Sequence, residues 1–268
     1  MLNSLDIGAS ALDQFQQGMN VIGNNIANVG TVGYKSSSAN FEDTLSETLQ
    51  GGTGTPIQVG TGVTTSSTVT DFTQGNITQT GGPSDLAIDG NGYFEVKNAG
   101  TGALYLTRAG NFSVQNGYLV TADGMRVQGY NDAGLSTVGD IKVDSNGSTA
   151  QVKSFNFSND GTLTVNLSDG TSITRGQVLL QNVASPQLLL KQGGNLYGNI
   201  AAAGPLTQLT VPGTNGTDSL RAGYLEQSNV DLASQFADLI EMQRGFQASA
   251  RVVTTSDEVL QEIVNLKR

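Results

Sequence analysis

Apolar residues recur with helical spacing near the start of the chain. They follow one another in steps of seven, three or four residues, the repeat of a heptad seam, and Gly8 stands in the position that the first step passes over. Gly8, Gly18 and Gly23 would each weaken an isolated helix by roughly 1 kcal/mol relative to Ala. The pattern therefore predicts an amphipathic helix that depends on a partner. Its seam consists of Leu5, Leu12, Phe15, Met19, Ile22, Ile26 and Val29.

A longer seam of the same kind lies at the other end of the chain. A helix over about residues 230–266 would be roughly 55 Å long. Gln243 and Asp257 occupy two seam positions, where polar residues can specify register or oligomer state. A single seam is also explained by a helix that covers its own domain, but two seams at opposite ends favour an assembly. The apolar members of this second seam are Leu232, Phe236, Leu239, Phe246, Val253 and Leu260.

Between the two helices the pattern changes to the alternation that is typical of β-strands. Asn116-Gly117 separates two alternating runs, a strong signal for a two-residue hairpin, and Asp160-Gly161 and Asp169-Gly170 punctuate further runs. Residues 51–70 are rich in Gly, Thr and Ser, which predicts an extended segment without a core. The predicted fold class is α+β, with long N- and C-terminal helices forming a coiled coil and a central, mainly antiparallel β domain.

The same pattern predicts four segments along the chain. The two helical ends are expected to pack on each other and on copies from other chains, because each has an apolar stripe to cover. The segments are an N-terminal helix in residues 1–35, an extended linker in 36–80, the β domain in 81–222 and a C-terminal helix in 223–268.

Composition excludes several kinds of chemistry. The chain has no His and no Cys, which removes imidazole bases, cysteine nucleophiles and typical zinc sites. Its 23 acidic and 13 basic residues give a net charge of −10, unsuited to binding nucleic acid. The sequence contains no stretch of about 18 apolar residues, so no transmembrane helix is predicted. We therefore predict no catalytic, cofactor-binding or metal-binding residues, and no enzyme.

Two local patterns superficially suggest sites. Asp89-Gly90-Asn91-Gly92 lacks the further acidic ligands of a calcium loop, and a strand-like run follows it, so we interpret it as a turn. The carboxylate pairs Glu42/Asp43 and Asp257/Glu258 have no pocket signature around them, so we interpret them as solvated faces.

The segment after the first seam has the residues of a helix end. Asn28 and Gly30 can adopt left-handed conformations that stop a helix, and Gly33 allows a further bend. The segment also resembles the N-terminal signature of the flagellar rod and hook axial family, through Asn24-Asn25-Ile26-Ala27-Asn28 and Thr31-Val32-Gly33-Tyr34-Lys35. The motif residues that carry this resemblance are Asn24, Asn25, Ala27, Asn28, Gly33, Tyr34 and Lys35.

Further segments are similar to the same family, so the resemblance covers most of the chain. Three segments resemble the family's C-terminal region, namely residues 228–232, 242–248 and 254–261. Three others resemble its β domain, namely residues 71–76, 86–94 and 107–112.

The resemblance implies a structural subunit that polymerises into a helical tube. The terminal helices would form an inner coiled-coil layer around an export channel, with the two seams as the assembly interface and the β body outside. The implied partners are further copies of the chain, other flagellar axial proteins and the flagellar export apparatus. The first basic residue is Lys35, so we expect export to the flagellum without a cleaved signal peptide.

Within the family, the sequence favours a subunit of the flagellar hook, which transmits torque for motility. The ending after Val259 is similar to that of short hook proteins, and the Gly- and Thr-rich linker from Gly51 to Val63 would be compliant, as a bending joint requires. A stiff shaft would be expected to brace that region. The alternative is a distal rod subunit of the flagellar basal body. A more distant alternative is a secreted β-rich adhesin or glycan-binding protein, which would need an exposed aromatic platform or a calcium site.

Overall fold

The computed structural model describes residues 2–50, 57–147, 149–204, 209–213 and 218–266. The chain divides into two compact units. We call Met1–Val29, Ser36–Asp71 and Val230–Arg268 the helical unit, and Gly30–Lys35 with Phe72–Asn229 the β unit. Both helices and a mostly antiparallel sheet are present, so the predicted α+β class is confirmed. Among the described residues, no helix is long and apolar enough to cross a membrane.

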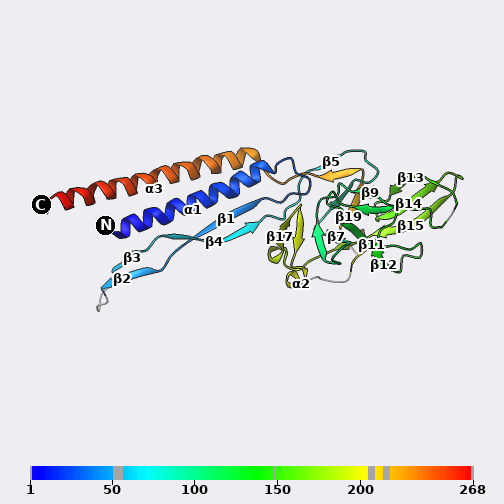
Figure 1. The fold of residues 1–268 in the computed structure, drawn as a ribbon, viewed down its shortest axis with the longest axis horizontal. Coiled ribbons are helices and arrows are strands. Elements are labelled where there is room, and N and C mark those ends of the chain that lie inside the picture. The colour runs from blue at the N-terminus through cyan, green and yellow to red at the C-terminus, as the bar shows by residue number, and fades with distance from the viewer. Residues whose placement is uncertain (1, 51–56, 148, 205–208, 214–217, 267–268) are drawn as a thin grey trace. The chain divides into compact units, whose positions relative to one another are not determined.

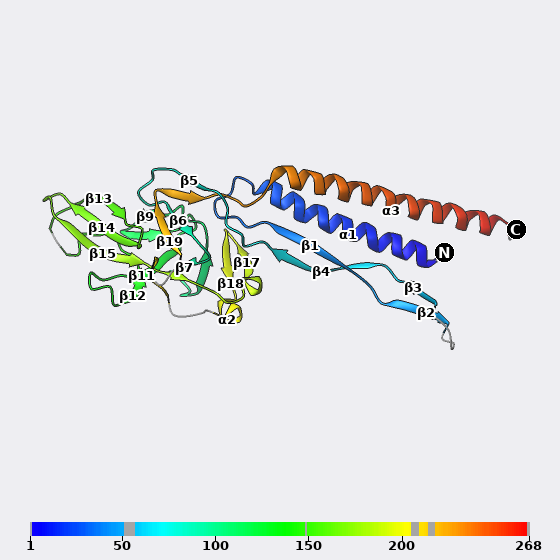
Figure 2. The same cartoon turned by 180° about the vertical axis from the view of Figure 1, so that it is seen from behind.

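Two long helices dominate the helical unit, and both were predicted. They are α1 (Leu2–Ala27) and α3 (Leu232–Leu266), and they lie side by side (Figures 1 and 2). The backbone amide of Ala233 donates to the carboxylate of Asp231 at 3.0 Å, which satisfies one of the free amides at the start of α3. The start of α1 and the end of α3 lie at the same end of the helix pair (Figure 1), as an antiparallel arrangement requires.

A narrow β arm completes the helical unit. Its antiparallel pairs are β1 (Ser37–Asp43) with β4 (Val63–Thr70) and β2 (Ser46–Gln50) with β3 (Ile57–Gly60). α1 packs against β1 and β4, and the Thr65 hydroxyl hydrogen-bonds to Gln17 at 3.0 Å. Residues 51–56, which begin the predicted Gly- and Thr-rich stretch, lie outside the described residues. The described part of the stretch consists largely of paired strand.

The β unit is built on an antiparallel sheet with short pairs of strands beside it. Along the main path the strand order is β13-β14-β15-β11-β7-β8-β18-β17. Its elements are β5 (Ile77–Gln79), β6 (Leu86–Asp89), β7 (Tyr93–Lys97), β8 (Leu104–Thr107), β9 (Ser113–Gln115), β10 (Tyr118–Val120), β11 (Arg126–Tyr130), β12 (Val138–Asp140), β13 (Val152–Phe157), β14 (Thr162–Leu167), β15 (Ser172–Val178), β16 (Leu180–Gln181), the 3₁₀-helix η1 (Pro186–Leu188), β17 (Leu190–Gly193), β18 (Leu196–Gly198), α2 (Ile200–Ala203), β19 (Ser219–Ala222) and β20 (Tyr224–Glu226).

The predicted hairpin turn and the two other predicted breaks between alternating runs all join neighbouring strands of this unit. Asn116 and Gly117 have φ angles of 51° and 76° between β9 and β10, the positive pair that a two-residue hairpin of this type needs. Asp160-Gly161 lies between β13 and β14, and Asp169-Gly170 between β14 and β15. The turn expected at Asp89–Gly92 joins β6 to β7, where Asp89 pairs with Arg221 at 2.5 Å.

The β unit has an apolar core of its own. Phe94 and Phe112 meet edge to face at 5.0 Å between ring centroids, and the strands around them contribute aliphatic side chains. A second, smaller cluster contains Tyr93 and Tyr197 with their ring centroids 6.0 Å apart. The buried residues of the main cluster are Leu86, Ile88, Phe94, Val96, Phe112, Leu119, Val127, Ile141, Val143, Phe157, Leu163, Val165, Leu167, Val178, Leu180, Leu196 and Leu220.

Candidate functional site

Small residues take part in most of the contacts along the line where α1 and α3 meet. The sequence numbers of the contacting residues rise along α1 as they fall along α3, which defines an antiparallel pair. The contacts are Ser4 with Ser256, Gly8 with Val253, Phe15 with Gly245, Gly18 with Met242 and Asn25 with Gln235.

The glycines at this line allow the two helices to come close. A Cβ atom added to Gly8 would lie 2.7 Å from the Val253 side chain, and one added to Gly245 would lie 2.6 Å from the Phe15 ring. Real Cβ atoms do not approach so closely, so a side chain at either position would force a neighbour to move. Gly23, by contrast, has nothing within 4 Å of such an atom. The sequence predicted Gly8 only as a weak point of a helix and did not single out Gly245, whereas the structure shows that both are packing positions.

The large seam residues of α1 flank this line. Ser10 and Gln14 lie on the side of α1 that meets the β arm, where Ser10 contacts Gly62 and Gln14 hydrogen-bonds to Thr65. A helix turns by about 100° per residue, so Leu5, Leu12, Met19 and Ile26 lie on the flank away from the β arm. Ile22 is buried, and the other predicted seam residues on and just after α1, including Phe15 and Val29, are partly exposed.

On α3 the predicted seam is open to solvent over part of its length. Leu239, Phe246, Val253 and Leu260 are half-buried. Leu232 and Phe236, however, are 39% and 49% exposed. Among the described residues of α3 none is buried. An apolar surface of this extent on a long helix is what an interface to another molecule would cover.

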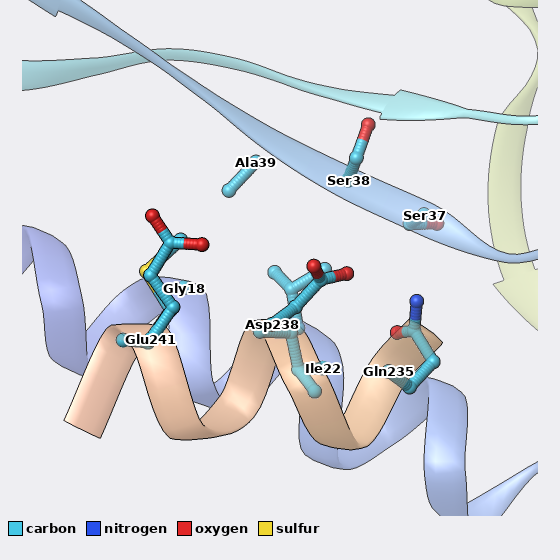
Figure 3. A pocket seen from close by; sticks show the side chains of 10 residues that line it. Gly18, Ile22, Ser37, Ser38, Ala39, Gln235, Asp238 and Glu241 are labelled. Atoms are coloured by element: carbon cyan, nitrogen blue, oxygen red, sulfur yellow. The ribbon is translucent and has the colours of Figure 1, made fainter. Parts of the chain in front are cut away.

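A groove opens between α1, β1 and α3 (Figure 3). Val21 and Ile22 of α1 and Ala39 of β1 contribute apolar atoms to it. From α3, Asp238 and Glu241 project their carboxylates toward the side on which β1 passes (Figure 3). The groove therefore combines apolar walls with an acidic edge.

Asn25 connects three elements of the helical unit, α1, β1 and α3. Its side chain is buried, and its amide nitrogen donates to the Ser37 carbonyl at 2.7 Å and to the Gln235 side chain at 2.8 Å. Its amide oxygen accepts from the Ser37 backbone nitrogen at 3.0 Å. The Asn28 side-chain amide instead donates to the Asn24 carbonyl at 2.8 Å, at the end of α1, where the same carbonyl also accepts from the Asn28 backbone amide at 3.2 Å. The Asn residues of the motif thus have separate structural roles.

The next motif residues belong to the β unit. Gly33 has φ +68°, and a Cβ atom there would lie 2.6 Å from the Ala109 backbone nitrogen, so glycine is required both by conformation and by space. Tyr34 is buried, with the Lys191 ammonium 4.7 Å from its ring centroid. Burial raises the pKa of Tyr34 above its ordinary value.

Lys35 is part of a buried ion cluster, by which we mean Lys35, Arg108 and Glu226. The Lys35 ammonium lies 2.6 Å from one oxygen of Glu226, and the Arg108 guanidinium 3.5 Å from the other, with all three side chains at most 1% exposed. Lys35 also donates to the Thr73 carbonyl at 2.6 Å, and Glu226 accepts from the Gly75 amide at 2.8 Å. Buried charges need such partners.

The second cation of the cluster rests on an aromatic side chain. The Arg108 guanidinium lies 4.8 Å from the Tyr93 ring centroid and donates to the Gly90 carbonyl at 2.8 Å. Burial raises the pKa of Tyr93 to about 12, although Arg108 partly opposes the shift. Neither Arg108 nor Glu226 was predicted from the sequence to have a role. A single sequence carries no signal that joins residues this far apart.

Chemically, the described residues offer packing surfaces and fixed charges. Among them no group of three acidic side chains lies close enough to hold a metal ion. The features that could serve another molecule are the open seam of α3 and the groove beside it, while the ion cluster is closed to solvent.

Three family models match successive parts of the chain. They are described as flagella basal body rod protein, flagellar hook protein FlgE/F/G D1 domain, and flagellar basal body rod FlgEFG protein C-terminal. The matched residues are 5–35, 87–165 and 221–266, respectively.

Individual relatives match over the full length. The chain is 42% identical to the flagellar basal-body rod protein FlgG of Bacillus subtilis, with 100% of both chains covered. It is 35% identical to the rod protein FlgG of Caulobacter vibrioides, with 99% of this chain and 100% of that one covered. With the flagellar hook protein FlgE of Borreliella burgdorferi it is 27% identical, again with 100% of both covered, in an alignment of 444 positions.

Proposed function

The chain belongs to the flagellar rod and hook protein family and is a structural subunit of the bacterial flagellum, and on that premise we propose that it is a distal rod subunit of the basal body. The family and the flagellar location agree with the resemblance found in the sequence. The relatives are structural proteins, which is consistent with the prediction that the chain is not an enzyme.

The comparisons favour a rod subunit, whereas the sequence alone favoured a hook subunit. Rod proteins align with the chain from end to end over 278 or 279 positions, close to its own 268 residues. The hook protein needs 444 aligned positions, so it contains long stretches that this chain lacks. One C-terminal family model, described for FlgE, FlgF and FlgG together, covers the ending after Val259 up to Leu266, so this ending by itself does not favour the hook. A hook subunit remains the alternative.

The β arm is the structural observation that carries the proposal. A compliant linker would suit a bending joint, whereas a stiff shaft needs that region braced. Seven register pairs join β1 to β4, from Ser37↔Thr70 to Asp43↔Val63, and β2 pairs with β3 beyond them. α1 packs on β1 and β4. A paired strand ladder held against a helix resists bending more than a free Gly- and Thr-rich chain does, which supports a rod.

We propose further that the terminal helices form an inner coiled-coil layer and that the predicted seams are its assembly interface. Support comes from the antiparallel helix pair and from the seam residues of α3 that the chain itself leaves exposed. The β domain would then form the outer layer. Further copies, other axial proteins and the export apparatus are the proposed partners, with export proceeding without cleavage of a signal peptide.

A deletion strain tests the rod assignment. Without a distal rod subunit, isolated basal bodies should contain a truncated rod and no hook, and purified tubes of the protein should be straight and rigid. A complete rod that lacks only the hook, together with curved tubes, would establish the alternative.

A seam substitution tests the assembly interface. Leu239→Asp should block polymerisation and leave the β unit folded, because an unpaired carboxylate buried at every subunit contact costs several kcal/mol. Leu190→Asp, at an exposed position in the β unit, is the matched control and should polymerise normally. Tubes of normal length from Leu239→Asp would refute the seam.

A further inference from the structure

One row of α3 side chains projects away from the helix that α3 packs on. Phe236, Ile240 and Arg244 are four residues apart, so they lie above one another on one face. At about 100° per residue this face is roughly opposite Met242 and Val253, which contact α1. Phe236 is 49% and Ile240 58% exposed, and Arg244 is exposed as well. We call these three residues the ridge.

The ridge is apolar for two turns and then basic. Arg244 makes no ion pair with any residue that the structure describes. A guanidinium with five donors, next to two exposed apolar side chains, is a combination enriched in protein interfaces.

The groove beside α3 has the complementary character. Val21, Ile22 and Ala39 supply apolar atoms, and Asp238 and Glu241 supply carboxylates at the edge. Neither carboxylate pairs with a cation among the described residues. Among the described residues that line the groove there is no positive charge, and the ridge offers a cation beside apolar side chains.

Phe236 and Ile240 cannot fill the groove of their own chain, because they project from the face of α3 opposite to the one that meets α1. Arg244 lies one turn after Glu241 on the same helix but makes no ion pair with it. We propose that the ridge of one copy docks into the groove of the next copy, with Ile240 against the apolar walls and Arg244 between Asp238 and Glu241. The inference rests on the proposed function as an assembling axial subunit and specifies one of its contacts.

The geometry of this contact determines the kind of assembly that it forms. The two surfaces differ, so the contact is heterologous and each docked copy presents a fresh ridge or groove to the next. Such contacts form rings or open helical arrays and not closed dimers. The charges at its edge would also select orientation, since a copy in the wrong register would bring like charges together.

Charge reversal in the full-length chain tests the proposal. Arg244→Glu alone, and Asp238→Lys with Glu241→Lys alone, should each raise the critical concentration for polymerisation by about tenfold or more. The chain that combines all three substitutions should polymerise near the wild-type concentration. Sedimentation of polymer and electron micrographs measure this, and circular dichroism of the monomers checks that the β unit remains folded.

Arg251→Glu is the control, because Arg251 is exposed on the same side of α3 but lies two turns beyond the ridge. It should polymerise as the wild type does. Wild-type polymerisation by Arg244→Glu, or no recovery in the combined chain, would overturn this contact while leaving the proposed function intact. Wild-type protein that forms no tubes would instead count against the proposed function itself.

Discussion

The two units bury their apolar residues to very different extents. In the β unit the main cluster contains seventeen buried residues, most of them 0–5% exposed. In the helical unit, Ile22 is the only buried apolar side chain among the residues described there. One unit completes its core by itself. The other presents an amphipathic pair of helices and a strand ladder whose apolar faces stay partly in water.

This difference indicates which unit is stable within one chain and which unit depends on contacts with other copies. Apolar burial is the main favourable term in folding, and it has to exceed the cost of ordering the chain. The β unit meets that requirement within one molecule. The helical unit gains little by comparison, so a large part of its stabilisation would come from copies that cover α3 and α1.

The largest expected effect is a difference in hydrogen exchange between the units. In dilute monomer we expect strong protection in β7, β11 and β14, up to the full stability of a domain, roughly 5 kcal/mol or more. Residues 5–29 and 232–264 should exchange quickly, and polymerisation should protect them. Mass spectrometry of monomer and polymer measures both states. Equal protection of both units in the monomer would contradict the comparison.

Removal of the central carboxylate of the ion cluster should weaken the β unit next most strongly. Glu226→Ala leaves Lys35 and Arg108 buried without a counter-charge, which should lower the free energy of unfolding by about 3–5 kcal/mol. Asp89→Ala removes the partner of Arg221 at a surface where both side chains are partly exposed, and should cost about 1 kcal/mol or less. Urea unfolding followed by tyrosine fluorescence compares the two. Similar losses would mean that the cluster has no special role.

A pair of glycine substitutions tests the helical packing at a smaller scale. Gly23→Ala should stabilise α1 by about 1 kcal/mol, because alanine is the better helix former and nothing lies near its added methyl group. Gly245→Ala makes the same chemical change in α3 against the Phe15 ring, so that gain should be lost or reversed. The helical circular dichroism signal during thermal unfolding reports on both. Stabilisation by both variants would show that the helices do not pack this closely in solution.

A further effect concerns alkaline pH in the β unit, where the buried Tyr93 titrates. Because burial raises the pKa of Tyr93 from 10.0 to about 12, the folded state holds this proton more tightly than the unfolded state does. The resulting stability is fully present below about pH 10 and is lost as the pH rises toward about 12, by at most about 1.4 kcal/mol per pH unit. Unfolding measurements across this range should show a shallower decline for Tyr93→Phe than for wild type. Identical declines would exclude a contribution from Tyr93.

Local patterns in the sequence were sufficient for the elements that depend on neighbouring residues. Helical spacing and the absence of proline predicted α3 to within two residues of its observed start, and Asn116-Gly117 predicted a hairpin. Both follow from interactions within a few positions of the chain, namely side-chain periodicity and the φ angles that Asn and Gly tolerate. The family also followed from contiguous motifs.

The tertiary structure decided what depends on residues far apart in the chain. The sequence alone determined that both ends are amphipathic helices and that the middle is β-rich, but it did not show that small residues take part in most of the contacts between α1 and α3. It also did not show that Glu226 joins Lys35 and Arg108, or that the strands after α1 form a braced arm. Each of these requires segments separated by tens to hundreds of residues to meet, and no local periodicity encodes which partner a buried charge or a glycine will meet.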